Sequence, residues 1–215
     1  MSIQINNRLQ SLKQVQLTRP GHFLFRSWAH LYRSRFPYQE LAPLPLIETS
    51  LLSDDAVIQG LIDSRSNQWA AFTLLEFYQS SVLLAYLATD PAFENQGLAR
   101  KLVNEQLEQN LTEQTPYFWL EANPKLWPFY QKLGFQRLPI PYFIPEFYGT
   151  GTEFMGLFVK AHSKISTIPK DVIQKFVSDL LLSGYGIKAN DVRYTNQMDI
   201  IQNYPQAEFD VENRD

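Results

Sequence analysis

The sequence predicts an α/β (α+β) protein with a mixed, mostly antiparallel sheet flanked by helices and a C-terminal helical extension. Segments rich in β-branched, aromatic and aliphatic residues alternate with polar turn clusters over residues 1–160. Amphipathic helical stripes lie between and after these segments. Of the 215 residues, 45% are hydrophobic and 14% aromatic, enough to bury a core. We expect one domain over residues 1–160 and an extension, packed on it, over residues 161–215.

Composition argues against several classes of function. With 19 Lys+Arg against 22 Asp+Glu, the formal net charge is -3, which disfavours broad nucleic-acid binding. The chain has no cysteine, so thiolate metal sites, disulfides and cysteine nucleophiles are excluded. His22, His30 and His162 are too scattered for a metal cage, and we expect no metal. No segment has the apolar length of a signal peptide or membrane span, so we expect a cytoplasmic protein without a membrane partner.

The first half of the chain predicts a strand, a helix and three further strands. Residues 14–18 indicate a short strand, and the apolar spacing from Phe25 to Tyr32 indicates an amphipathic helix. Two prolines in LAPLPLIETSLLSDD favour a broken helical segment over one continuous helix. Apolar runs separated by polar turns then predict three successive antiparallel strands, at residues 56–62, 69–78 and 82–89.

The next elements alternate helix and strand. In GLARKLVNEQLEQNL, four leucines and a valine share one helical face, and the apolar run YFWLEA predicts a strand. The following helix begins at Asn123-Pro124, where proline is tolerated in the first turn, and ends at Gly134, a left-handed cap. Residues 136–140 and 154–159 predict two last strands, joined by a Pro- and Tyr-rich connection.

The tail beyond residue 160 is predicted to be helical. A strong apolar stripe lies between Pro169 and Gly184, and a weaker helix runs through Met198 to Ile201. The stripe favours packing on the domain, with a homodimer contact as the alternative. The final residues, AEFDVENRD, predict a frayed acidic end.

The turn ENQGLA, at residues 94–99, carries the first chemical signal. Glycine at position 97 lets backbone approach a ligand closely, and a helix follows at once. The first N–H groups of that helix lack internal partners and lie at the positive end of its dipole. Such an end attracts an anion, and a pyrophosphate is the natural candidate. A single glycine before a helix is more often only a turn, so further motifs have to decide.

Two further motifs frame this turn. LATDP ends the preceding strand, and Asn123 is followed seven residues later by Tyr130 in FYQKLGF. Together they resemble the GNAT superfamily of N-acetyltransferases: a strand ending in a Leu-x-Val-x-Pro-like run, a Gln/Arg-x-x-Gly-x-Gly/Ala turn opening a helix, then Asn-x-x-x-x-x-Leu-Tyr-x-x-x-Gly-Phe. The resemblance spans residues 14–160. It implies a six- to seven-stranded sheet that splays between strands 82–89 and 117–122, with the pantetheine arm of acetyl-CoA in the gap.

Several positions depart from the family pattern. Glu94 stands where the family prefers Gln or Arg, Thr89 where it often has Val, and Phe129 where it often has Leu. Ala99 is a permitted variant. Because backbone N–H groups hold the phosphates in that family, the negative charge of Glu94 should weaken binding rather than abolish it.

The resemblance also implies the site residues. Backbone groups of Leu87 and Thr89 would bind the pantetheine arm, and Asn123 would brace it. Tyr130 would lie near the sulfur and protonate the departing thiolate. The pyrophosphate would be held by the following residues, the first four through backbone N–H groups and the last as a candidate side-chain contact: Gln96, Gly97, Leu98, Ala99 and Arg100.

The general base and the acceptor stay open. No carboxylate lies within residues 82–88, which leaves Glu76 on the preceding strand and Glu121 close to Asn123. Each also fits a solvated strand residue, and water can remove the proton from many amines. Aromatic-rich loops favour a shaped pocket for a small molecule, with these candidate lining residues: Tyr38, Glu40, Tyr142 and Tyr148.

We therefore expect an enzyme that transfers the acetyl group of its cosubstrate, acetyl-CoA, to a primary amine, with a small-molecule amine as partner. The alternative is an acyl-CoA-binding regulatory or sensor module without turnover, motivated by Glu94 and the missing strand carboxylate. A P-loop nucleotide-binding protein is disfavoured, because no Gly-rich run ends in Lys-Ser/Thr.

Overall fold

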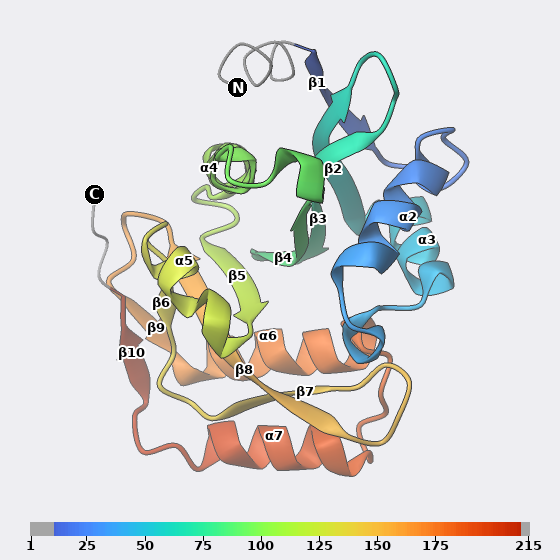
Figure 1. Cartoon of the computed structure of the whole chain (residues 1–215). Coiled ribbons are helices and arrows are strands. Elements are labelled where there is room, and N and C mark those ends of the chain that lie inside the picture. Colours follow the sequence, from blue (N-terminus) through green and yellow to red (C-terminus); the bar gives the residue numbers. More distant parts are fainter. Residues whose placement is uncertain (1–10, 212–215) are drawn as a thin grey trace. The chain divides into compact units, whose positions relative to one another are not determined.

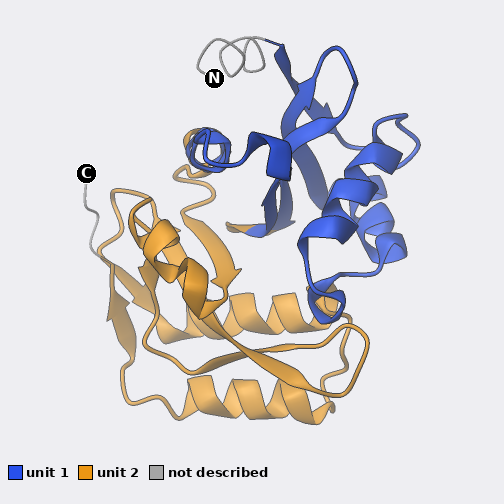
Figure 2. Ribbon diagram, in the orientation of Figure 1, with its two compact units in different colours: residues 1–77, 84–106 blue, residues 78–83, 107–215 orange. Residues whose placement is uncertain are grey.

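A computed structural model describes residues 11–211 of the chain. These residues divide into two compact units, unit 1 within residues 1–77 and 84–106 and unit 2 within residues 78–83 and 107–215 (Figure 2). The mixed α/β fold is confirmed: eight strands belong to a mostly antiparallel sheet, against six to seven predicted, and two more form a small second sheet (Figure 1).

The elements through α4 follow the order that the sequence predicts. Prolines break the segment after α2 into a 3-10 turn and a short helix, as expected. In unit 1, β1 pairs antiparallel with β2, and β2 with β3. The elements are β1 (Leu12–Leu17), α2 (Phe25–Arg35), η1 (Tyr38–Glu40), α3 (Leu44–Leu52), β2 (Ala56–Asp63), β3 (Trp69–Tyr78), β4 (Ser81–Thr89), η2 (Pro91–Phe93) and α4 (Leu98–Asn110).

Helices cover both faces of the unit 1 strands. On one face, the ring of Trp28 in α2 meets Phe72 of β3 edge-on at 5.6 Å, and Trp69 Nε1 donates to the carbonyl of Leu24 at 3.1 Å. Because neighbouring strand residues point to opposite faces, Ala71 faces the other way. There it joins a buried cluster with the start of α4: Leu61, Ala70, Ala71, Phe93, Leu98 and Leu102. Ala70 shares this cluster with Ala71 because a register shift opposite Leu61 and Ile62 interrupts the alternation of faces. Burying each leucine contributes about 1.5–3 kcal/mol, which anchors the start of α4.

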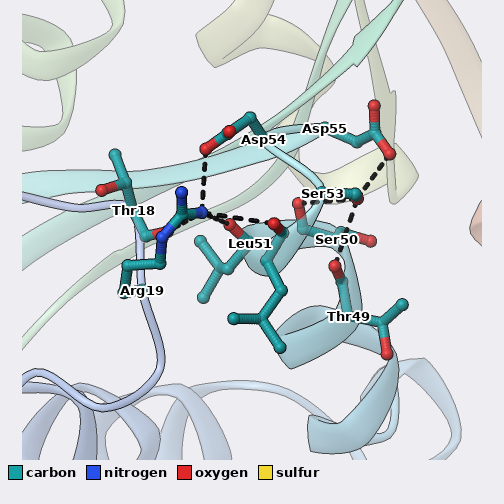
Figure 3. Close-up of polar contacts among 9 residues, drawn as sticks. Thr18, Arg19, Thr49, Ser50, Leu51, Ser53, Asp54 and Asp55 are labelled. Atoms are coloured by element: carbon teal, nitrogen blue, oxygen red, sulfur yellow. Dashed lines mark hydrogen bonds and ion pairs between the residues drawn. The ribbon is translucent and has the colours of Figure 1, made fainter.

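A polar contact fixes the end of α3 (Figure 3). Arg19 Nη1 donates to the carbonyl oxygen of Leu51 at 2.8 Å and pairs with Asp54 Oδ1 at 2.9 Å. Asp54 has a φ of 61°, so the chain reverses there before entering β2. The ion pair is well exposed and contributes at most about 1 kcal/mol. The bond to the helix carbonyl is the contact that holds the loop after β1 to this turn.

Unit 2 is organised around β8. This strand pairs antiparallel with β5, β6 and β7. The remaining elements are β5 (Tyr117–Ala122), η3 (Pro124–Leu126), α5 (Trp127–Gln131), β6 (Gln136–Arg137), β7 (Tyr142–Pro145), β8 (Thr152–Ala161), β9 (Thr167–Pro169), α6 (Lys170–Asp179), the π-helical turn η4 (Leu180–Gly184), α7 (Val192–Gln202) and β10 (Glu208–Asp210).

Three of these strands were not predicted from the sequence. β7 lies in the Pro- and Tyr-rich connection, where Tyr142 pairs with Met155 of β8. β10 pairs with β9, with Phe209 opposite Ile168 and both side chains buried. The prediction of a frayed end is therefore wrong for β10, because the apolar Phe209 finds a buried place; residues 212–215 lie outside the described part. The strand predicted at 136–140 is shortened to two residues, and Pro139 follows it.

The two faces of the unit 2 strands are covered by different helices. Trp119 of β5 stacks on Phe176 of α6 at 4.5 Å, whereas its neighbour Phe118 meets Phe135 edge-on at 6.0 Å on the side of α5. The apolar stripe of the tail is buried within unit 2: Ile173, Phe176, Val177, Leu180 and Leu181. Among the described residues, no helix is long and apolar enough to span a bilayer.

Candidate functional site

The predicted site residues divide between the two units. Unit 1 contains Glu76, Leu87, Thr89 and residues 96–100, and unit 2 contains Glu121, Asn123 and Tyr130. A groove shared by both groups, and the splay of the sheet, stay predictions.

The turn before α4 presents backbone donors. Asn95 and Gly97 both have left-handed backbone, with φ of 60° and 77°. A Cβ built on Gly97 would meet nothing within 4 Å, so the space beside the turn is open. The carbonyl of Gly97 accepts the first helical bond, from Lys101 N at 3.0 Å. The N–H groups of residues 98–100 therefore precede the helical ladder and suit an anion.

The side chains of the turn play different parts. Leu98 is buried and fixes the helix start, whereas Arg100 is exposed on the first turn of the helix. The Gln96 amide folds back and donates to the carbonyl of Ala92 at 3.4 Å. Binding of a pyrophosphate by the backbone of this turn, with Arg100 as a side-chain contact, stays a prediction. At the end of β4, Leu87 and Thr89 are half-buried, and their use as partners of the pantetheine arm stays a prediction.

Glu94, the unfavourable residue of the turn, has a partner. Arg35 at the end of α2 donates from Nη2 to Glu94 Oε1 at 2.5 Å, with side-chain exposures of 32% and 42%. The guanidinium offsets most of the negative charge that the sequence placed beside the turn. Sequence reasoning missed Arg35, because a separation of 59 positions along the chain gives no spacing signal.

Glu76 lies in a tyrosine-rich part of unit 1. Burial and the neighbouring Tyr32 raise the pKa of Tyr86, and the charge of Glu76 adds to the rise. The Tyr86 hydroxyl donates to the carbonyl of Glu40 at 2.6 Å and accepts from Ala42 N at 3.0 Å. Tyr86 thus ties β4 to the segment around η1, where two acceptor candidates were predicted.

Asn123 has a structural use in unit 2. Its Oδ1 accepts from Lys125 N at 3.1 Å, which caps η3. The structure gives its Nδ2 no partner among the described residues. One half of the side chain thus starts the helix, and the other half suits the bracing role that the resemblance implies.

Tyr130 lies in an aromatic shell. Its ring is 6% exposed and packs at 5.0, 6.0 and 6.2 Å from Phe129, Phe135 and Phe158. Burial raises the pKa of Tyr130, so the phenol keeps its proton at neutral pH. The structure shows no hydrogen bond from this hydroxyl to a described residue. The position fits a core aromatic ring and also a held proton donor.

Glu121 is held by two tyrosine hydroxyls. Tyr142 of β7 donates to Oε1 at 2.5 Å, and Tyr185, which follows η4, donates to Oε2 at 2.8 Å. Burial and the adjacent carboxylate raise the pKa of Tyr142, which keeps it a donor. Tyr142 is fully buried, so it contacts Glu121 rather than solvent, whereas Tyr38 and Tyr148 are exposed. No motif in the sequence pointed to Tyr185.

Tyr130 and Glu121 lie on opposite faces of β5. Tyr130 packs on Phe158, which pairs with Leu120 across the two strands and so shares its face. Glu121 is the next residue and points the other way, toward the side that α6 covers. The two candidate residues thus lie on opposite sides of one strand, and their roles as acid and base stay predictions.

Known proteins share the domain and the fold. Residues 54–137 match the family model described as the acetyltransferase (GNAT) domain. A Bacteroides thetaiotaomicron protein assigned to the GNAT acetyltransferases aligns with a TM-score of 0.63 at 18% identity, over 82% of this chain and 99% of its own. NAA60 of Arabidopsis thaliana, solved with acetyl-CoA, gives 0.56 at 14% identity over 70% and 98%.

A further solved structure has a similar fold. The ribosomal-protein-S18-alanine N-acetyltransferase of Escherichia coli gives a TM-score of 0.51 at 19% identity, over 72% of this chain and 98% of its own. At these low sequence identities, the structural similarity shows the shared fold alone. No curated protein matches the chain. Within residues 11–211, no group of three or more His, Cys, Asp or Glu is gathered to hold a metal ion.

Proposed function

We propose that this chain, in which residues 54–137 match the acetyltransferase (GNAT) domain model, transfers the acetyl group of acetyl-CoA to a primary amine in a ternary complex. The observation that carries the proposal is the turn at residues 94–99. Left-handed Gly97 and the first N–H groups of α4 form a backbone anion site inside the matched region. The charge of Glu94, the strongest objection from the sequence, is offset by Arg35.

The proposed cofactor contacts follow the chain. Backbone N–H groups from Gln96 to Ala99 bind the pyrophosphate, and Arg100 adds a side-chain contact. Leu87 and Thr89 bind the pantetheine arm through their backbone, and the Asn123 Nδ2 group braces it. Acetyl-CoA is the cosubstrate, and the chemistry needs no metal.

The proposed chemistry uses two side chains. A neutral amine attacks the thioester carbonyl carbon, so a base must first take a proton from the ammonium form. Glu121 is the better-supported base, because two phenols orient its carboxylate. Tyr130 gives its proton to the departing thiolate. The ordinary pKa is about 8.5 for a thiol and 10 for a phenol. Burial raises the pKa of Tyr130 further, so the transfer requires the negative charge that develops on the departing sulfur to lie beside the hydroxyl.

A small-molecule amine is the proposed acceptor. The support is the aromatic character of the loops in the sequence, which suits a shaped pocket better than a flat docking face. The Escherichia coli neighbour is named for an alanine of a ribosomal protein. A peptide amine therefore belongs in any acceptor panel beside polyamines and aminoglycosides.

Ligand-dependent stability tests the proposal. A ligand at about 100 times its dissociation constant adds roughly 2.7 kcal/mol to the free energy of unfolding. Millimolar acetyl-CoA should raise Tm by several degrees, and ATP or NAD should not match it. Mass spectrometry of the purified protein should also detect any retained CoA thioester. A shift with ATP and none with acetyl-CoA would contradict the proposal.

A non-catalytic acyl-CoA sensor is the second candidate. The observation that favours it is the burial of Tyr130, which fits a purely structural ring. Both candidates bind acetyl-CoA, so turnover separates them. Release of free thiol with an amine panel supports the enzyme, and tight binding without turnover of any amine supports the sensor.

A further inference from the structure

The C-terminal tail reaches the candidate base. Tyr185 lies beyond residues 54–137, the range of the family match, and its hydroxyl is 2.8 Å from Glu121 Oε2. We propose that Tyr185 is a positioning residue that fixes the carboxylate of Glu121, so that the tail completes the active site of this enzyme. This inference rests on the proposed function and names a residue that the family match does not contain.

The geometry distributes one donor to each carboxylate oxygen. Tyr142 approaches Oε1 from β7, and Tyr185 approaches Oε2 from the end of the tail helix. Two bonds from different elements fix both the position and the plane of the carboxylate. Each of these bonds restricts rotation of the carboxylate about its Cγ–Cδ axis.

The tail holds Tyr185 firmly. Its ring stacks on Phe147 at 4.9 Å with an interplanar angle of 23°. Its backbone N–H donates to the carbonyl of Leu180 at 2.9 Å, which closes the wide π-helical turn after α6. Such turns occur often at functional sites. Leu180 and Leu181 are buried, so the turn has a fixed base from which Tyr185 extends.

Glu121 also lies on the appropriate side. Its face of β5 is the one covered by α6, opposite the face that carries Tyr130. A thioester that meets the Tyr130 proton on one side would leave the amine to approach from the Glu121 side. The tail therefore borders the amine rather than the cofactor.

The step balances without any further reactant. One proton moves from the ammonium group to a Glu121 oxygen, and the amine lone pair forms the C–N bond. The C–S bond breaks, its electron pair stays on sulfur, and the thiolate takes the proton of Tyr130. Glu121 then releases its proton to water. After the C–N bond forms, the nitrogen loses its second proton, which passes through water to the phenolate of Tyr130. The products are the amide, free CoA and one proton.

A matched pair of variants tests the role. Tyr185→Phe removes the hydroxyl and keeps the stacked ring. Tyr194→Phe also removes a tail hydroxyl, one that contacts Ser178 Oγ at 2.9 Å and is not bonded to Glu121. We expect kcat to fall about tenfold in Tyr185→Phe and to stay near wild type in Tyr194→Phe. KM and calorimetric affinity for acetyl-CoA should not change in either variant.

A double variant tests whether Tyr185 acts through Glu121. Tyr185→Phe should cause no further loss of kcat when added to Glu121→Gln, since the oriented group is already gone. Additive losses would overturn the inference, as would equal kcat values in Tyr185→Phe and Tyr194→Phe. Equal Tm values in the two single variants would exclude a difference in folding.

The same measurements separate this inference from the proposed function. The probes are acetyl-CoA with spermidine, kanamycin and a peptide with an N-terminal alanine, followed by free thiol. If the wild type turns over a probe and Tyr185→Phe does so equally well, only the inference fails. If the wild type shows neither turnover nor an acetyl-CoA-dependent rise in Tm, the proposed function fails and the inference with it.

Discussion

The turn before α4 and the carboxylate group around Glu121 are built by opposite means. The turn relies on backbone N–H groups and a left-handed glycine, with open space beside it. Glu121 instead depends on side chains, because Tyr142 and Tyr185 come from distant parts of unit 2 to reach its two oxygens. Consecutive residues form the turn before α4, whereas tertiary packing brings together the residues around Glu121.

The contrast has consequences for substitution. A site made of backbone N–H groups tolerates most side-chain changes, but it depends strongly on the glycine whose left-handed φ shapes the turn. A side-chain site is sensitive at every partner, because each hydroxyl helps to hold the carboxylate. The variants below test the two kinds of site against each other.

The largest effect is expected at the side-chain site. Glu121→Gln keeps the shape of the side chain but removes the proposed base, so kcat should fall about a hundredfold or more, with little change in acetyl-CoA affinity. Glu76→Gln is the matched test of the other candidate carboxylate. Steady-state kinetics with an accepted amine measures both. If kcat falls only in Glu76→Gln, then Glu76 of unit 1 is the base and Glu121 is not.

Tyr130→Phe tests the other half of the proton transfer. The ring keeps its contacts with Phe135 and Phe158, so binding of acetyl-CoA should barely move, whereas kcat should fall about a hundredfold. Because burial raises the pKa of Tyr130, its titration should not appear in the rate between pH 6 and 9. Tyr117→Phe, at another buried tyrosine of unit 2, is the control. Unchanged kcat in Tyr130→Phe would leave Tyr130 a structural ring.

Gly97→Val tests the backbone site. A β-branched residue at a φ of 77° is strained by about 1–2 kcal/mol, so the turn should shift and the Kd for acetyl-CoA should rise tenfold or more. Gly186→Val is the control, because Gly186 has a φ of 66° and equally open surroundings but lies in the tail. Calorimetry should show a weaker Kd only for Gly97→Val. Equal affinities in both variants would remove the turn from the cofactor site.

The smallest effect is expected at the ion pair beside the turn. Arg35→Gln leaves Glu94 unpaired and should weaken acetyl-CoA binding by up to about tenfold, or 1.4 kcal/mol. Adding Glu94→Gln should restore most of the affinity, and Glu94→Gln alone should tighten binding. Both changes should shrink at high salt, because the pair is partly exposed. If the affinity for acetyl-CoA changes neither with salt nor with either substitution, the Arg35–Glu94 pair does not interact electrostatically with the ligand.

Local patterns determined the elements that depend on neighbouring residues. Proline breaks, polar turns and apolar spacing predicted the central strands and α4, because those signals act within a few residues. The turn at Gly97 was predictable for the same reason: a glycine and a helix start are adjacent in the chain. Position Asn123 was also predictable, since its cap contact spans two residues.

Pairing between distant segments was decided only by the tertiary structure. The sequences of β7 and β10 do not by themselves predict strands. These strands form because β7 pairs with β8 at Tyr142 and β10 pairs with β9 at Phe209. The neutralisation of Glu94 by Arg35 and the fixing of Glu121 by Tyr185 are of the same kind. The sequence alone thus determined the fold class and the backbone turn, where local geometry suffices. Only the tertiary structure determined that Arg35 pairs with Glu94 and that Tyr185 bonds Glu121. These residues are far apart in the chain, and no sequence pattern links such distant positions.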